Sequence, residues 1–219
     1  MAMSVAEINH ASVHRTSSID PRHTARARVE QAVADLASGR SIVLFDPRRG
    51  EASLVAAAEF VTTASVAFMV RYASGFVKVA VPEEDCVRLL LPPMWQFGGF
   101  DASSVPAVTV DAVAGTGTGI SAADRAQTIR TIADPVTVPT ALSRPGHVAP
   151  IIARRGGTGV AETVVRLVRA AGLRPMAALC ELVSPADPTR MADERDSIDF
   201  ARDHALTFVS VFDAVICAQ

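Results

Sequence analysis

Two short runs near the middle of the chain carry the residue types that could do chemistry. Thr118-Gly119-Ile120-Ser121-Ala122-Ala123-Asp124-Arg125 lies between an alternating, β-branched segment and a segment with helical periodicity. Small residues there let a ligand approach the backbone, and Ser121 or Asp124 can cap the following helix, whose first N–H groups attract anions. Arg144-Pro145-Gly146-His147-Val148 places a histidine just after Pro-Gly, where we expect a turn that lets the imidazole face a cleft. Taken alone, the first run is more often a capped turn, and a lone histidine is more often structural than catalytic.

The two runs occur together, and in that combination they resemble signatures of the 3,4-dihydroxy-2-butanone 4-phosphate synthase family. The family patterns are Thr-Gly-Val-Ser-Ala-Ala-Asp-Arg and Arg-Pro-Gly-His, and Leu179-Cys180-Glu181-Leu182 is similar to the third signature, in the same order. The resemblance extends from about Arg28 to Ile216. It implies one α/β domain and a reaction that splits ribulose 5-phosphate into formate and a four-carbon ketone phosphate. It also implies one or two magnesium ions and a homodimer with active sites near the subunit interface.

The acidic loop that marks this family is altered here. The family reads Asp-Asp-x-x-Arg-Glu-Asn-Glu-Gly-Asp after the first strand, and this chain reads Phe45-Asp46-Pro47-Arg48-Arg49-Gly50-Glu51-Ala52-Ser53, with one residue lost. Arg48 keeps the arginine and Glu51 keeps the second glutamate. Arg49 stands where the resemblance places a metal-binding glutamate, and Ser53 replaces the closing aspartate.

A second family motif, Arg-Gly-Gly-His-Thr-Glu, supplies a phosphate-holding arginine and a metal-binding histidine. The best alignment deletes about four residues and puts Val160 in place of the histidine; an alternative on Arg155-Gly156-Gly157 puts Thr158 there. Hard cations need several oxygen ligands at short range. We therefore expect no family-type magnesium site, no metal ligands and no cofactor, with Mg²⁺ needed only if the family reaction itself survives.

The candidate catalytic residues are Glu181, His147 and Lys78. In the family, the residue matching Glu181 is a general acid or base and the one matching His147 lies in the substrate cleft; a carboxylate and an imidazole suffice for proton transfer. Lys78 is the only lysine in the chain and stands where the family has a strand cysteine that faces the substrate. Alternation puts it on one strand face with Phe76 and Ala80, where lost solvation would favour the neutral amine, a better base or nucleophile. The alternative is a lysine at a rim that extends to water.

The expected substrate-binding residues combine what remains of the family cleft with an aromatic loop. Phe97-Gly98 replaces an Asn-Asn pair of the family's substrate loop, which makes that wall more apolar, although Trp95 and Phe97 can equally pack the loop. Cys180 adjoins Glu181 on a strand, so we expect its side chain on the opposite face, in the core. The full substrate-binding set is Arg48, Glu51, Thr118, Ser121, Asp124, Trp95 and Phe97.

The elements that must position these residues alternate between strand and helix. This order predicts an α/β (α+β) fold, a single domain with a mixed β-sheet flanked by helices. Helices are expected at 29–38, 65–72, 82–89, 126–132, 161–171 and 197–204, and strands at 41–45, 54–58, 75–81, 105–113, 148–152, 175–182 and 206–211.

Composition bounds the remaining possibilities. Of the 219 residues 49% are apolar and 20% charged, as in globular chains; no apolar run could span a membrane, and a net charge of −2 gives no basic footprint for nucleic acid. Three scattered cysteines, Cys86, Cys180 and Cys217, favour a reduced, cytoplasmic setting. Residues 1–28 are polar and lack the apolar segment of a signal peptide, so we expect a mobile arm before a domain at 29–219.

Together these observations favour a diverged, metal-independent enzyme of the family. It would use acid–base chemistry (isomerisation, elimination or cyclisation) on a small carbonyl or enol substrate, for example in specialised metabolism, and work as a homodimer without nucleic-acid or membrane partners. Two alternatives stay open. The chain is a genuine synthase that converts ribulose 5-phosphate to butanone phosphate and formate, or it is a catalytically silent relative that binds a partner subunit or small molecule.

Overall fold

Strands and helices alternate along the part of the chain that this computed structural model describes, residues 21–94 and 105–217. Two short 3₁₀ turns, at 58–60 and 139–141, complete the regular structure. The helices are α1 (Pro21–Ala37), α2 (Thr63–Tyr72), α3 (Glu83–Arg88), α4 (Ala122–Ala133), α5 (Val160–Ala170), α6 (Glu194–Asp203) and α7 (Val211–Cys217). The strands are β1 (Ile42–Asp46), β2 (Glu51–Ala57), β3 (Lys78–Pro82), β4 (Val105–Pro106), β5 (Val110–Ala112), β6 (Leu142–Ala153), β7 (Ala177–Glu181) and β8 (Thr207–Ser210).

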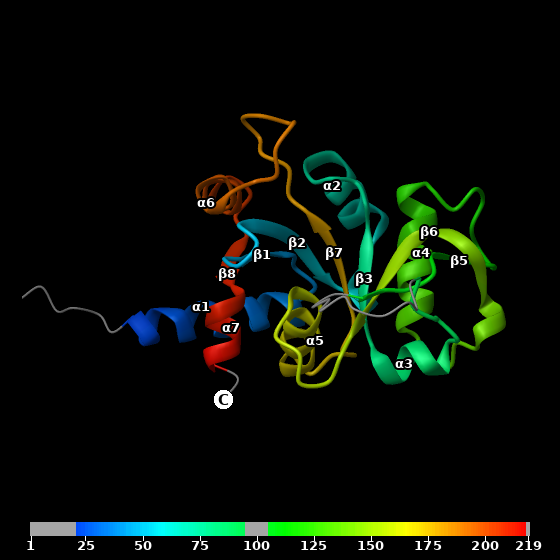
Figure 1. Ribbon diagram of the computed structural model, residues 1–219. Helices are drawn as coiled ribbons and strands as arrows, with labels where there is room; N and C mark the ends of the chain where they lie inside the picture. The colour runs from blue at the N-terminus through cyan, green and yellow to red at the C-terminus, as the bar shows by residue number, and fades with distance from the viewer. Residues whose placement is uncertain (1–20, 95–104, 218–219) are drawn as a thin grey trace, which may run out of the picture.

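All these strands join one mixed sheet, in the order β4-β6-β3-β7-β2-β1-β8, with β5 paired to β6 beside this path (Figure 1). The central strand β3 runs parallel to β6 and antiparallel to β7. Leu179 of β7 lies opposite Lys78 of β3, and Glu181 follows Leu179 by two positions. Because side chains alternate along a strand, Lys78 and Glu181 project from the same face of the sheet.

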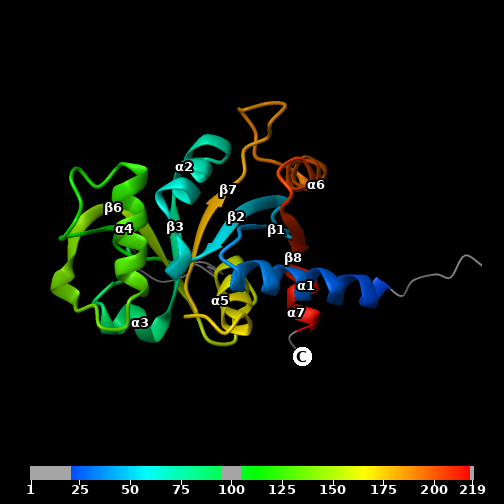
Figure 2. The same ribbon diagram turned by 180° about the vertical axis from the view of Figure 1, so that it is seen from behind.

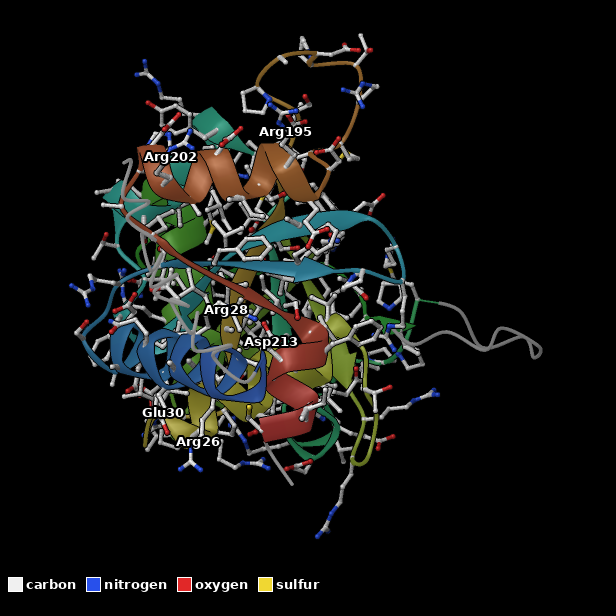
Figure 3. The ribbon with its side chains drawn as sticks, turned by 90° about the vertical axis from the view of Figure 1, so that its left-hand side faces the viewer. Arg26, Arg28, Glu30, Arg195, Arg202 and Asp213 are labelled. Carbon is white, nitrogen blue, oxygen red and sulfur yellow. The ribbon has the colours of Figure 1, made fainter. Side chains whose placement is uncertain are left out.

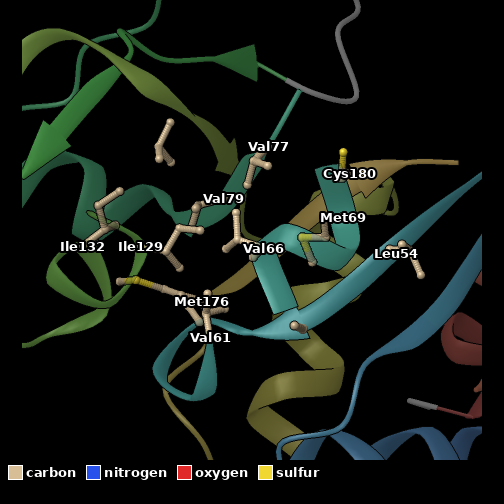
Figure 4. Packing of buried hydrophobic residues seen from close by; sticks show 14 of the residues in the cluster. Leu54, Val61, Val66, Met69, Val77, Val79, Ile129, Ile132, Met176 and Cys180 are labelled. Atoms are coloured by element: carbon tan, nitrogen blue, oxygen red, sulfur yellow. The ribbon is translucent and has the colours of Figure 1, made fainter. Parts of the chain in front are cut away.

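Helices cover both faces, and each face has its own apolar cluster. On the Lys78 face, α1, α5 and α7 pack against Ala80, Ile151 and Leu179 (Figures 1 and 2). On the other face, α2, α4 and α6 pack against strand residues such as Val79 and Cys180, and Figure 4 shows the former among Val66 and Ile129. The predicted fold class is confirmed, and so is the core position of Cys180, which is fully buried.

The two ends of the described chain meet on the Lys78 face. The guanidinium of Arg28 on α1 pairs with the carboxylate of Asp213 on α7 at 2.8 Å, and Figure 3 shows these two helices across the sheet from α6. Helix α7 was not expected from the sequence. Because Ser210 ends β8 and its hydroxyl oxygen accepts from the N–H of Asp213, it caps a helix where only a strand end was predicted.

Three predicted boundaries are corrected. Residues 21–28, assigned to the N-terminal arm, belong to α1, which starts at a proline as helices often do, while residues 1–20 lie outside the described residues. The strand expected at 105–113 is two short strands, β4 and β5. The turn expected at Pro145-Gly146 is instead part of the long strand β6, because Leu142, Ser143 and Val148 pair with β5 on either side of it.

Candidate active site

The centre of the candidate site is a direct contact between Lys78 and Glu181. The ammonium of Lys78, at the start of β3, contacts Oε1 of Glu181, at the end of β7. Their side chains are only 18% and 20% exposed, so most of each charged group is shielded from water. The lysine is therefore held by a carboxylate inside the fold, and the alternative of a rim lysine that extends to water does not describe its position.

A small cavity of about 40 Å³ opens beside this pair. Three carboxylates line it, and each faces a side-chain cation: Asp46 pairs with Arg48 at 3.1 Å, Glu51 with Arg49 at 3.4 Å, and Glu181 with Lys78. Such a volume holds about one water molecule, so a substrate enters only when some of these side chains move apart. The lining residues are Asp46, Arg49, Glu51, Ser53, Lys78, Ile151, Val160, Ala161, Leu179 and Glu181.

One wall of the cavity is the N-terminus of α5. Val160 and Ala161, its first two residues, line the cavity, and its N-cap residue Gly159 has no side chain that could cap the free N–H groups. Uncapped N–H groups at a helix N-terminus favour anions. The arrangement therefore offers an anion site next to the Lys78–Glu181 pair.

Arg48 ties two loops of the site together. Its guanidinium pairs with Asp46 at the end of β1 and donates to the carbonyl oxygen of Thr158 at 2.7 Å, in the loop before α5. Glu51, predicted with Arg48 to bind substrate, lines the cavity and is about one-third exposed. The structure thus places Glu51 at the cavity, whereas Arg48 does not line it and instead bridges two loops of the fold.

His147 sits on β6 in a second acid–base pair. Its ring Nδ1 lies 2.7 Å from Oδ2 of Asp111 on β5, and its backbone N–H donates to Oδ1 of the same carboxylate at 2.8 Å. Its side chain is 42% exposed, whereas that of Asp111 is 12% exposed. His147 precedes Val148, where the pairing of β6 with β5 resumes after a register break, and it does not line the cavity beside Lys78 and Glu181.

The loop before α4 packs against this histidine. Gly119 has φ +86°, and a Cβ added there would collide with the carboxylate of Asp111 and lie 2.6 Å from Nδ1 of His147. Ser121 caps α4 by accepting from the N–H of Asp124 at 3.0 Å, and Oδ2 of Asp124 accepts from the N–H of Gly119 at 3.0 Å. Ser121 and Asp124, predicted to bind substrate, are therefore engaged in holding this loop, while Thr118 is exposed on it.

Sequence reasoning missed two carboxylates of the site, Asp46 and Asp111. Both are buried, at 3% and 8% exposure, within or at the end of apolar strands. A charged residue in such a strand is rarely buried without a partner, and that signal could have found both. The predicted residues Trp95 and Phe97 lie outside the described residues.

Cys180 shows how the two sheet faces differ beside the site. Burial raises the pKa of its thiol, and its Sγ lies 3.3 Å from the hydroxyl oxygen of Ser74. It therefore stays a neutral packing group on the opposite face from Glu181, its neighbour in sequence.

Comparisons with known proteins show which family this chain resembles. Residues 30–216 match the sequence model of the family described as 3,4-dihydroxy-2-butanone 4-phosphate synthase. The chain is similar to riboflavin biosynthesis protein RibBA of Salinispora tropica, with 46% identity over 194 residues, which is 86% of this chain and 48% of that protein. It is also similar to RibBA of Mycobacterium tuberculosis, at 44% identity over 85% of this chain and 45% of that protein. The chain thus spans about half the length of the curated relatives it matches.

Solved structures of 3,4-dihydroxy-2-butanone 4-phosphate synthases also resemble this chain. A crystal structure of 3,4-dihydroxy-2-butanone 4-phosphate synthase in complex with two magnesium ions superposes with a TM-score of 0.79 at 35% identity, covering 84% of this chain and 93% of that one. A cation-free form of a synthase of this kind superposes with a TM-score of 0.78 at 35% identity, covering 86% of this chain and 95% of that one.

The magnesium-bound relative contradicts the prediction of a site without a cofactor. That prediction counted two lost ligands one at a time, at Arg49 and Val160, whereas the fold gathers the carboxylates of Asp46, Glu51 and Glu181 around one cavity. As placed here these groups do not fit a hard cation. Each faces an arginine or lysine, and residues 21–94 and 105–217 contain no group of three His, Cys, Asp or Glu side chains arranged to hold a metal.

Proposed function

Because the chain belongs to the 3,4-dihydroxy-2-butanone 4-phosphate synthase family, we propose that its Lys78–Glu181 cavity converts ribulose 5-phosphate into the four-carbon ketone phosphate and formate. The match over residues 30–216 and the 46% identity to a riboflavin biosynthesis protein support the reaction of the family over a new one. This reverses the preference drawn from the changed loops, in which a diverged activity came first.

The observation that carries the proposal is the Lys78–Glu181 contact at the centre of the sheet. Carbon–hydrogen bonds beside the keto group of a ketose are weakly acidic, and a carboxylate within hydrogen-bond reach removes such a proton as general base. The ammonium of Lys78 stabilises the negative charge that then develops on the carbonyl oxygen, because in a shielded site a fixed cation acts more strongly than in water. Substrate entry separates the two groups and leaves each to face it.

His147 and Asp111 form the second acid–base pair of the proposal. The Asp111 carboxylate accepts from Nδ1–H of the imidazole, which fixes the ring and leaves Nε2 to take up or deliver a proton. The uncapped N-terminus of α5 holds the phosphate of the substrate, beside Arg49. The side chains and backbone N–H groups named above therefore bind the phosphate, remove the first proton and return a proton to the product.

A second candidate is the same acid–base chemistry on a different small carbonyl substrate. The arginine at position 49, which pairs with Glu51 at 3.4 Å where the family resemblance places a glutamate, favours it. In that case the protein still removes a proton beside the carbonyl group, but it does not release formate.

One experiment separates these candidates. The purified chain is incubated with ribulose 5-phosphate and Mg²⁺ in D₂O, while formate and the exchange of hydrogen beside the keto group are followed by NMR. Formate release supports the synthase proposal. Exchange without formate favours the second candidate. If neither formate nor exchange is observed, both candidates are overturned, and the silent relative that the sequence also left open remains.

Two broader expectations also remain proposals. We infer a homodimer from family membership, to be tested by analytical ultracentrifugation of the chain. We infer a cytoplasmic setting from its three unpaired cysteines, to be tested by fractionating cells that produce the chain from its own gene. No helix in the described part of the chain has the length and apolar character to cross a bilayer.

A further inference from the structure

A second cavity, of about 590 Å³, lies on the far side of the loop that precedes α5. Its wall is formed by the end of β6, this loop, one face of α5 and the start of α3, and it shares no lining residue with the Lys78–Glu181 cavity. The cavity falls within the size range of small-molecule sites. Its lining residues are Pro82, Glu84, Ala153, Arg154, Arg155, Gly156, Glu162, Val165, Arg166 and Arg169.

Four arginines and two glutamates make this lining net positive in a chain whose net charge is −2. Arg154, Arg155 and Arg169 are exposed and have no acidic partner among the residues that the structure describes. Arg166 is held in place, donating to the carbonyl oxygen of Gly157 at 2.7 Å and to the hydroxyl of Thr163 at 3.1 Å. Guanidinium groups bind phosphate through paired, charge-assisted hydrogen bonds.

Glu162 adds an independent sign of a ligand. Glu162 is only 5% exposed, and its Oε1 accepts from the N–H of Arg154 at 3.0 Å. Its Oε2 is also buried and has no hydrogen-bond partner within the described residues. A buried acceptor without a donor is costly. Glu162, Arg166 and Arg169 follow at i, i+4 and i+7 on α5, so the unpartnered oxygen and two of the guanidinium groups share one helix face.

We propose that this cavity binds a phosphorylated small molecule of about nucleotide size. Its phosphate groups pair with Arg155 and Arg169, and a rotation of the Glu162 side chain lets its uncharged end donate an N–H or O–H to Oε2. The other side of the same loop carries Thr158, whose carbonyl oxygen binds Arg48 of the candidate active site. The cavity is nevertheless separate from that site and does not depend on the proposed reaction.

The test is calorimetric titration of the full chain with ADP and with inorganic pyrophosphate. Arg155→Ser with Arg169→Ser removes two exposed cations that hold no partner in the described structure, so folding is preserved. We expect at least a tenfold loss of ADP affinity in this double variant and in Glu162→Gln, and no change in Arg195→Ser, which removes an exposed arginine on α6 (Figure 3). Pyrophosphate should lose affinity in the double variant but little in Glu162→Gln.

Four results would overturn the proposal. The first is no binding of either probe at millimolar concentration, and the second is equal affinity in wild type and double variant. The third is loss of ADP binding in Lys78→Met but not in the double variant, which would place the anion in the Lys78–Glu181 cavity. A polyanion such as RNA that binds the chain while ADP does not also contradicts it, because the arginines then serve a surface and not a cavity.

Discussion

Replacing Lys78 with methionine removes the ammonium group that faces Glu181 and keeps much of the apolar stem. Both side chains are about four-fifths shielded from water, so the variant leaves a carboxylate without its partner in a poorly solvated place. Breaking a fully buried pair costs about 3–5 kcal/mol. Because a fifth of each group is exposed here, we expect about 1–3 kcal/mol, since water compensates part of the loss.

The same variant should abolish most of the activity. If the ammonium stabilises the charge on the carbonyl oxygen, kcat/KM falls by about 10²–10³, as for the loss of one such donor. Urea unfolding and turnover are measured for Lys78→Met, Glu181→Gln and the double variant, which forms a thermodynamic cycle. The double variant should be more stable than Lys78→Met, because the unpartnered charge is gone.

Strictly additive stability losses would show that the two groups do not interact, and the account of the pair would fail. Wild-type turnover in Lys78→Met would show that the lysine has no role in the chemistry, whatever its effect on folding. A matched control is Arg195→Met, which removes an exposed cation on α6 and should change neither quantity measurably.

Three further predictions follow from particular contacts. Asp111→Asn removes the charged partner of His147, so kcat/KM should fall about 10²-fold or more with an unchanged circular dichroism spectrum; unaltered kinetics would argue against the second acid–base pair. Gly119→Ala places a Cβ against that pair at a positive φ, so thermal unfolding should show at least about 1 kcal/mol of destabilisation, and a wild-type melting temperature would contradict the packing. Asp35 is largely buried, and although burial alone would raise its pKa, hydrogen bonds from Thr207, Gln31 and Arg40 lower it; its stabilisation is present at neutral pH and lost as the pH falls below about 4. Asp35→Asn should therefore cost about 1–3 kcal/mol at pH 7 and less near pH 3, and a pH-independent difference in urea unfolding would show that the carboxylate charge is not involved.

The fold followed closely from the sequence because local and global signals agree in most elements. Alternation over residues 75–81 correctly placed Lys78 on the face opposite Val77 and Val79. The exceptions are segments where tertiary pairing decides the outcome. Pro145 and Gly146 indicate a turn by local chemistry, yet β5 packs so closely that a Cβ at Gly146 would collide with the backbone of Val110, and the segment is held in a strand.

The site was less predictable than the fold. The approach of Lys78 to Glu181 depends on the antiparallel register of β3 and β7, and the chain order alone does not specify that register. Asp111 was missed because its partner His147 is far along the chain and meets it only through strand pairing. Asp46 was missed although its partner Arg48 is only two residues away, because the loop after β1 was read only as a family motif. The prediction of no cofactor rested on two substituted positions, Arg49 and Val160, and the magnesium-bound relative contradicts it.

The central claim is that the Lys78–Glu181 cavity carries out the family reaction. Its most direct test is carbon NMR of uniformly ¹³C-labelled ribulose 5-phosphate incubated with the chain and Mg²⁺. The account predicts that a labelled formate signal grows together with that of the four-carbon ketone phosphate, and that Glu181→Gln reduces both by about 10²-fold or more. An unchanged substrate spectrum with folded wild-type protein, or an equal rate in Glu181→Gln, would contradict it.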